Sequence, residues 1–266
     1  MTRLALLTEI PAPYRIPLFN ALAERVALRV LFLAPVDPRR AFYEQHADEW
    51  RFDHEFLPGK ELRRGGRWVV LNRGVVRALR RFRPDAVGVG GWNQPAFWLA
   101  LAYTRVRRLP LLVWVESTAR DARTESRPLE LAKRTMIGKA AGFFVPGSAA
   151  RAYVRGFGVP EDLIAVAPNA VDERVFAPAA VDRRGRSTCT FLYAGRLDPD
   201  KGLDVLLRAF ADVPGELVLV GSGSEEAHLR SLAASRVHFR GALGRDALPG
   251  EYAAADVFVL PSRSEP

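Results

Sequence analysis

Residues 193–210, YAGRLDPDKGLDVLLRAF, read as the end of a strand, a charged loop and a helix. The loop holds Arg196, Asp198, Asp200 and Lys201, and a glycine follows the lysine. Strand, loop and helix form the repeating unit of α/β domains, which bind ligands at the carboxyl ends of their strands. The stretch therefore predicts the fold class and the place where the chemistry lies.

Three interpretations of this loop compete. Asp198-Pro-Asp200 is a pair of carboxylates of the kind that binds Mg²⁺ or Mn²⁺, but the flanking cations would repel a metal ion. A solvated turn whose four charges cancel is the second interpretation. In the third, Arg196, Lys201 and the amino end of helix 202–211 hold an anion such as a diphosphate. Two charge-assisted hydrogen bonds of about 1.5–3 kcal/mol each would suffice without a metal, which favours the third.

A second glycine loop supports the anion site. Residues 219–229, LVGSGSEEAHL, place Gly221, Ser222 and Gly223 between a strand and a helix. Glycines there let the backbone approach a ligand closely, although this short pattern is a weak signal by itself.

Apolar and amphipathic segments alternate along the chain, which predicts doubly wound parallel sheets covered on both faces. For a first domain, 1–174, we expect strands at 3–8, 28–34, 85–91, 111–116, 142–146 and 164–168, and helices at 15–25, 68–82, 94–107, 127–140 and 148–157.

The proline-containing, charged segment 175–188 predicts a linker to a second domain, 189–266. There we expect strands at 189–195, 216–221, 237–241 and 256–260, and helices at 202–211, 225–235 and 247–254. Because a parallel sheet needs a crossover after its last strand, we expect this second domain to be incomplete at Pro266.

Composition excludes several classes of protein. The chain of 266 residues has one cysteine, Cys189, which excludes a disulfide framework and a cysteine-based zinc site. The four histidines have no metal-like spacing, and no apolar segment resembles a signal peptide or reaches the roughly 20 residues of a membrane span. We therefore expect a soluble or peripheral protein without a metal site built from cysteines or histidines.

The net charge of +9 is uneven, because residues 1–178 carry +10 and residues 179–266 carry −1. A basic half favours an acidic partner such as a phosphorylated substrate or an anionic lipid surface, and arginine-rich codon usage is the alternative. No recognition motif for nucleic acid accompanies the charge.

The charged loop, together with LVLVGSGSEEAHL, VHFRGAL, LPGEYAAADVFVLPSRSEP and APNAVD, resembles family 4 glycosyltransferases. The start TEIPAPYRIPLFNAL also resembles bacterial members. The resemblance implies a GT-B fold, in which two Rossmann-like domains face each other across a cleft, with the second domain incomplete here. It also implies retaining, metal-independent transfer from a nucleotide sugar, which is a substrate, so that no cofactor is expected.

By this resemblance Arg196 and Lys201 hold the donor diphosphate, and Glu265 faces the donor sugar. The second Glu of the family signature would fall beyond Pro266, which puts the activity of the chain itself in doubt. The donor-binding set implied is Gly195, Arg196, Lys201, Gly202, Gly221, Ser222, Gly223 and Glu265, with Arg196, Lys201 and Glu265 as the catalytic candidates.

In this fold the first domain usually meets the acceptor. Many members carry a histidine after the strand at 111–116, whereas this sequence has Glu116, which either orients a hydroxyl group or is a capping or solvated carboxylate. Trp92 and Asn93 follow another strand and suit sugar hydroxyls, unless they only begin a helix. Tyr14 and Arg15 are further acceptor-side candidates, because prolines fix the loop that precedes them.

Residues 60–84 hold nine Lys and Arg against one Glu. Between Arg67 and Arg83 the cations interleave with apolar residues, which predicts a basic amphipathic helix that contacts an anionic membrane through 60–83. A helix packed on its own sheet with solvated arginines is the alternative.

The sequence thus predicts a hexosyltransferase of cell-envelope glycan or lipid-linked glycan synthesis, located in the cytoplasm or at the inner face of the membrane. The alternatives are a non-catalytic nucleotide-sugar or glycan-binding module and a GT-B epimerase or phosphorylase. The epimerase would require carboxylates and histidines in the cleft, and the phosphorylase would require a pyridoxal-phosphate lysine.

Overall fold

The computed structural model describes residues 1–37, 47–64, 67–119, 127–169, 171, 173–176 and 188–263. The chain divides into two compact units, Met1–Val171 and Asp172–Glu265. Most of the predicted linker, residues 177–187, lies outside the described residues, so its bounds and those of the two domains stay a prediction.

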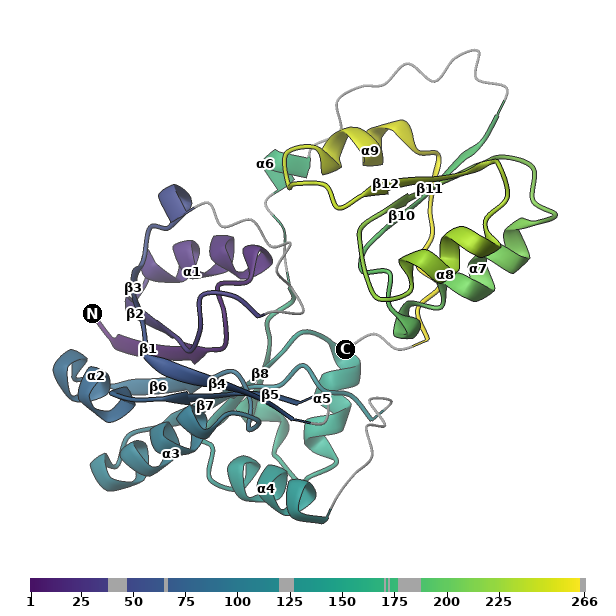
Figure 1. Cartoon of the computed structure of the whole chain (residues 1–266). Coiled ribbons are helices and arrows are strands. Elements are labelled where there is room, and N and C mark those ends of the chain that lie inside the picture. Colours follow the sequence, from purple (N-terminus) through teal and green to yellow (C-terminus); the bar gives the residue numbers. More distant parts are fainter. Residues whose placement is uncertain are drawn as a thin grey trace. The chain divides into compact units, whose positions relative to one another are not determined.

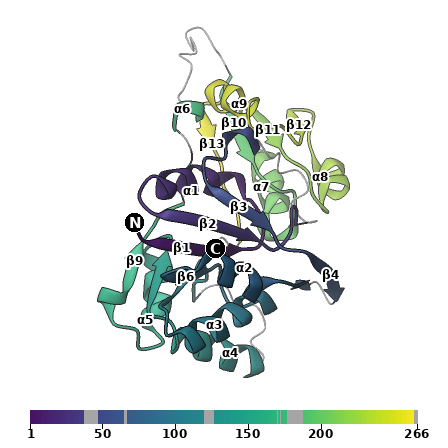
Figure 2. The same cartoon turned by 90° about the vertical axis from the view of Figure 1, so that its left-hand side faces the viewer.

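The first unit contains a parallel seven-stranded sheet in the order β3-β2-β1-β6-β7-β8-β9. β1 lies inside the sheet, between β2 and β6 (Figure 2). The strands are β1 (Arg3–Thr8), β2 (Ala27–Phe32), β3 (Asp53–Phe56), β6 (Ala86–Val89), β7 (Leu111–Trp114), β8 (Gly142–Val145) and β9 (Ile164–Val166).

Helices cover both faces of this sheet (Figure 1). Side chains alternate along β1, so that Leu7 joins one core cluster and Leu6 joins the other. Phe19 of α1 (Ile16–Ala23) packs in the cluster of Leu6. The cluster of Leu7 receives side chains from α2 (Val75–Phe82), α3 (Pro95–Arg107), α4 (Arg127–Ile137) and α5 (Ser148–Arg155).

Short 3₁₀ turns complete the described part of the first unit. They are η1 (Pro13–Arg15), η3 (Ala47–Glu49) and η4 (Glu161–Leu163).

The predicted helix 68–82 is wrong in its first half, where the chain forms an antiparallel hairpin of β4 (Gly59–Arg64) and β5 (Arg67–Asn72). Trp68 and Val70 are buried with the period of two that a strand requires. Gly74 then has a φ of 83°, and α2 begins only after it, with its buried residues at helical spacing. The basic amphipathic helix over Arg67–Arg83 is therefore shortened to α2.

The second unit is a smaller sheet with the same parallel organisation, in the order β12-β11-β10-β13. Its strands are β10 (Thr190–Ala194), β11 (Glu216–Val220), β12 (Val237–Gly241) and β13 (Val257–Phe258). α7 (Leu203–Phe210) and α8 (Glu226–Leu232) lie on one side of these strands and α9 (Leu248–Ala254) lies on the other (Figure 1). This unit also contains α6 (Glu173–Phe176) and η5 (Pro199–Lys201).

The alternation of strands and helices is thus the predicted one in both units, apart from the hairpin, the unpredicted edge strand β3 and the unpredicted short helix α6. None of the helices in the described ranges is both long enough and apolar enough to cross a bilayer.

Candidate active site

The charged loop lies between β10 and α7, at the carboxyl end of β10. The Arg196 guanidinium contacts Asp198 through Nη1, and its Nη2 lies 3.0 Å from Oδ2 of Asp200. Nζ of Lys201 lies 3.9 Å from the same Oδ2, and the Lys201 side chain is only 11% exposed. The structure therefore brings the two predicted diphosphate-binding cations together around Asp200.

The loop is braced by the segment that follows β13. Arg263 donates its backbone N–H to the Asp200 carbonyl at 2.9 Å and Nη1 to the Pro199 carbonyl at 2.5 Å. Its Nη2 lies 2.7 Å from Oδ1 of Asp204 in the first turn of α7. Gly202, directly before α7, has a φ of 65°. These contacts fix the turn that carries Lys201 to the amino end of a helix, where an anion is stabilised.

The second glycine loop, after β11, packs against the charged loop. Leu197 donates its N–H to the Ser222 carbonyl at 3.0 Å, and Glu225 donates to the Leu197 carbonyl at 2.8 Å. A Cβ on Gly221 would lie 1.8 Å from the Gly195 carbonyl oxygen, and one on Gly223 would lie 2.4 Å from that of Leu197. Both glycines are thus required by the neighbouring loop. Their approach to a ligand stays a prediction.

Asp198 ties the two loops together. Its Oδ1 accepts hydrogen bonds from the backbone N–H of Ser224 at 3.0 Å and from the Ser224 hydroxyl at 3.1 Å. Burial alone would raise the pKa of Asp198, but the Ser224 donors and the Arg196 guanidinium together outweigh burial and hold it below 3.8. Ser224 was missed by the sequence analysis, although it follows the glycine loop directly.

The remaining donor-side residue, Glu265, lies outside the described residues, so its role stays a prediction. Within the described residues no three His, Cys, Asp or Glu side chains gather as metal ligands would. The carboxylates of Asp198 and Asp200 instead face Arg196.

The first unit has a polar group at the carboxyl ends of β1 and β7. Arg15 Nη2 lies 2.5 Å from Glu116 Oε1, and its Nη1 donates to Thr8 Oγ1 at 3.0 Å. The guanidinium also lies 4.9 Å from the Trp114 ring and 5.8 Å from the Tyr14 ring. Three of the acceptor-side candidates, Tyr14, Arg15 and Glu116, therefore meet at one place.

A second polar group lies at the carboxyl ends of β1 and β6. Glu9 Oε1 accepts hydrogen bonds from Asn93 Nδ2 and from Gln94 Nε2, both at 2.7 Å. Trp92 precedes this pair and accepts a hydrogen bond at its carbonyl from Trp98 Nε1 at 2.9 Å. Glu9 was not among the predicted site residues, because nothing in the sequence links it to residues more than eighty positions away.

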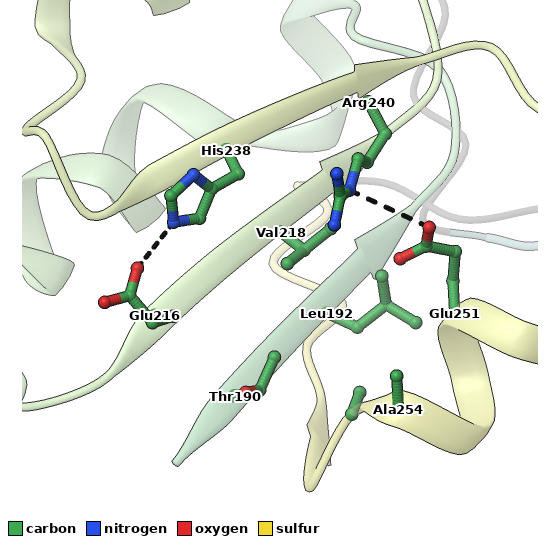
Figure 3. A pocket seen from close by; sticks show the side chains of 9 residues that line it. Thr190, Leu192, Glu216, Val218, His238, Arg240, Glu251 and Ala254 are labelled. Carbon is green, nitrogen blue, oxygen red and sulfur yellow. Dashed lines mark hydrogen bonds and ion pairs between the residues drawn. The ribbon is translucent and has the colours of Figure 1, made fainter. Parts of the chain in front are cut away.

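A shallow pocket of about 250 Å³ lies elsewhere, on the face of the second sheet toward α9 (Figure 3). Glu216 and His238 point toward each other across β11 and β12, with 2.5 Å between Oε2 and Nε2, and Arg240 Nε lies 3.8 Å from Glu251 Oε1. None of the predicted donor residues lines this pocket. It therefore adds nothing to the candidate active site.

Family comparisons agree with the predicted resemblance. Residues 18–175 match the family described as Glycosyltransferase Family 4, and residues 188–266 match the one described as Glycosyl transferases group 1.

Two curated relatives are similar to shorter parts of the chain. A D-inositol 3-phosphate glycosyltransferase from Acidothermus cellulolyticus is 37% identical over 141 residues, which cover 44% of this chain and 32% of that protein. A GDP-mannose-dependent monoacylated alpha-(1-6)-phosphatidylinositol monomannoside mannosyltransferase from Corynebacterium glutamicum is 32% identical over 114 residues. These residues cover 36% of this chain and 30% of that protein. The chain thus spans about a third of the length of the curated relatives that it matches.

Among solved structures, Anabaena Alr3699/HepE in complex with UDP-glucose superposes with a TM-score of 0.72. The match covers 99% of this chain and 75% of that chain at 17% identity. This likeness confirms the predicted fold class, with two Rossmann-like α/β domains of GT-B type.

Proposed function

The chain belongs to glycosyltransferase family 4, and from this premise we propose that it transfers a sugar from a nucleotide-sugar donor to a glycan or lipid-linked acceptor. The observation that supports the donor half is the convergence of Arg196 and Lys201 on Asp200 at the start of α7. Two cations beside a helix amino end suit the two phosphates of a nucleoside diphosphate.

In this proposal the diphosphate replaces Asp200 as the partner of both cations. Negative charge builds on the diphosphate as the bond to the sugar breaks, and the fixed guanidinium and ammonium groups stabilise that charge. Arg196 is held in place by Asp198, which in turn is anchored on Ser224. The leaving group therefore meets charges that need little rearrangement.

Two finer features belong to the same proposal. The transfer retains the anomeric configuration of the donor, as the family resemblance implies. It needs no metal, because the two cations already neutralise the diphosphate and would repel a divalent ion. Glu265 contacts the donor sugar by the same resemblance.

The acceptor belongs to the first unit in this proposal. One relative is named for inositol phosphate and the other for a phosphatidylinositol mannoside, which supports a polyol acceptor, either free or linked to lipid. Trp92, Asn93 and the group around Arg15 and Glu116 are the candidate acceptor contacts.

We further propose peripheral contact with an anionic membrane from the cytoplasmic side, through residues 60–83. Leu62 of β4 and Leu71 of β5 are 50% and 45% exposed. Five exposed cations lie close to these leucines in the sequence, on the hairpin, on α2 and between them: Lys60, Arg63, Arg73, Arg77 and Arg80. A surface that mixes exposed leucines and cations is typical of an interfacial contact.

A donor assay tests the function directly. The chain is incubated with UDP-glucose and, separately, GDP-mannose, with D-inositol 3-phosphate or phosphatidylinositol as acceptor. Release of UDP or GDP and product formation are measured. We expect activity with one donor, unchanged by EDTA, and at least a tenfold loss in Arg196→Ala or Lys201→Ala, or about 1.4 kcal/mol of barrier. Arg107→Ala, on the exposed end of α3, is the matched control.

The configuration of the product, read by NMR, tests retention. Wild-type rates in both loop variants would exclude the assigned diphosphate site. Binding of UDP or GDP without hydrolysis or transfer would instead favour the alternative, a non-catalytic nucleotide-sugar-binding module.

A further inference from the structure

Glu9 lies at the point in the first sheet where the direction of strand addition reverses. From β1 the chain continues to β2 and β3 on one side, and it returns to β6 on the other side. In open α/β sheets this reversal opens a crevice between the carboxyl ends of the two strands, where ligands bind. Glu9 directly follows β1, and Asn93 lies between β6 and α3.

The backbone of Glu9 is held firmly. Its carbonyl accepts hydrogen bonds from Leu33 at 3.1 Å and from Ala34 at 2.9 Å, the residues that follow β2. The side chain therefore extends from a fixed point of the sheet edge.

The carboxylate of Glu9 is oriented by two amides. Gln94 is fully buried, and its Oε1 accepts from the Val70 N–H at 2.9 Å, which leaves Nε2 to donate to Glu9 at 2.7 Å and to the Trp68 carbonyl at 3.2 Å. Because the Val70 donor fixes the amide orientation, Nε2 must face the carboxylate. Asn93 donates to the same Oε1 at 2.7 Å.

The second oxygen, Oε2, makes no hydrogen bond or ion pair to any residue in the described ranges. Both groups that hold Glu9 are neutral, so its negative charge is not cancelled locally. The carboxylate of Glu116 differs, because it is paired with Arg15, whose side chain is 11% exposed. Glu9 is thus a partly exposed, pre-oriented carboxylate without a cation paired to it in the described ranges.

A carboxylate with an oxygen available accepts short, strong hydrogen bonds from hydroxyl groups. We propose that Glu9 binds a ring hydroxyl group of a polyol, a sugar or a cyclitol, and so selects the acceptor. Asn93 and Gln94 are positioning residues that aim its carboxylate. This inference rests on the proposed transferase function, whose acceptor it describes.

Saturation-transfer NMR on the whole chain tests the inference without requiring turnover. The probes are myo-inositol, methyl α-D-mannopyranoside and methyl α-D-glucopyranoside, and UDP and GDP are titrated separately. We expect at least one polyol to bind, its affinity to fall at least tenfold in Glu9→Gln, and nucleotide affinity to stay within twofold. Glu24→Gln, an exposed carboxylate of the same unit, is the matched control and should bind as the wild type does.

Thermal unfolding by circular dichroism establishes that Glu9→Gln is folded. If it is not folded, Asn93→Ala tests the inference instead, because it removes one of the two hydrogen-bond donors to Glu9 and Asn93 is exposed. We expect this variant to lose at least threefold in polyol affinity. Polyol binding unchanged in the folded variants, or no polyol binding by the wild type, would overturn the role of Glu9. Polyol binding that depends on Glu9, without any binding of UDP or GDP, would contradict the transferase proposal but support the polyol site at Glu9.

Discussion

Asp198 and Ser224 are 26 residues apart in the sequence, and their hydrogen bonds join the charged loop to the glycine loop. Oδ1 of Asp198 accepts from both the backbone N–H and the hydroxyl of Ser224, while Oδ2 contacts Arg196. The Asp198 carboxylate therefore holds the two loops together and also orients Arg196, the arginine predicted to bind the diphosphate.

Asp198→Ala and Ser224→Ala should each lower the free energy of unfolding by about 1 kcal/mol, because each removes the hydrogen bond between the Asp198 carboxylate and the Ser224 hydroxyl. The double variant should lose less than the sum, since both changes break the same contact. Urea unfolding of the four proteins measures the coupling. Strict additivity would mean that the two residues do not act together.

The free energy of unfolding at acid pH should depend on the Asp198 carboxylate. The pKa of Asp198 is lowered in the folded chain, so its contribution is present above its unfolded pKa and is lost as the pH falls through its folded pKa. The stability difference between wild type and Asp198→Asn should thus shrink from neutral pH to about pH 2. Urea unfolding at several pH values measures it, and a constant difference would contradict the lowered pKa.

Asp200→Asn should tighten the binding of UDP or GDP. Asp200 lies beside both Arg196 and Lys201, and in the proposed site a bound diphosphate takes its place. Partly exposed ion pairs of this kind contribute about 0.2–1 kcal/mol, which predicts about a 1.4- to fivefold gain in affinity. Calorimetric titration measures the gain, which should shrink as salt is raised. Unchanged affinity would favour the interpretation of the loop as a solvated turn.

Gly221→Ala should destabilise the second unit by roughly 3 kcal/mol or more, because the new Cβ would meet the Gly195 carbonyl at a φ of 136°. Gly250→Ala is the matched control, since nothing lies within 4 Å of its Cβ position in α9. Alanine there should be neutral or slightly stabilising. Thermal unfolding of both variants distinguishes packing between loops from a general cost of replacing glycine.

Charge reversal at Arg77 and Arg80, both exposed on α2, should weaken binding to vesicles that contain phosphatidylglycerol. Each cation near an anionic surface contributes about 1 kcal/mol, so the double change Arg77→Glu/Arg80→Glu should lower the partition coefficient by at least tenfold. Sedimentation with vesicles measures it, with Arg107→Glu as control. Equal binding of wild type and variant would limit these arginines to a solvated surface.

Alternation of apolar and amphipathic segments predicted most of the strands and helices, because each strand buried on both faces forms a short continuous apolar run. It failed at 67–72, because Trp68, Leu71 and Val75 also stand at a helical spacing. Gly74, which separates β5 from α2, was not recognised as a break. β3 was missed because Asp53–Phe56 is mostly polar and sits at the edge of the sheet.

At the candidate site, Arg196 and Lys201 could be found because they stand in one short loop. Ser224 and Glu9 could not be found in this way, since their partners are distant in sequence. The contact of Glu9 with Asn93 depends on β1 lying beside β6. A local sequence pattern does not predict which strands are neighbours in the sheet. The prediction of a parallel sheet supplied the edge where ligands bind but not the order of its strands.

The place of β1 inside the sheet also bears on how the protein is made. Leu4–Leu7 pair with Ala86–Val89, so after β1 has left the ribosome some eighty further residues must follow before its second edge is covered. Such non-local pairing slows folding and leaves an apolar strand open to other chains in the meantime. The nascent chain should therefore depend on chaperones most strongly until β6 has been synthesised.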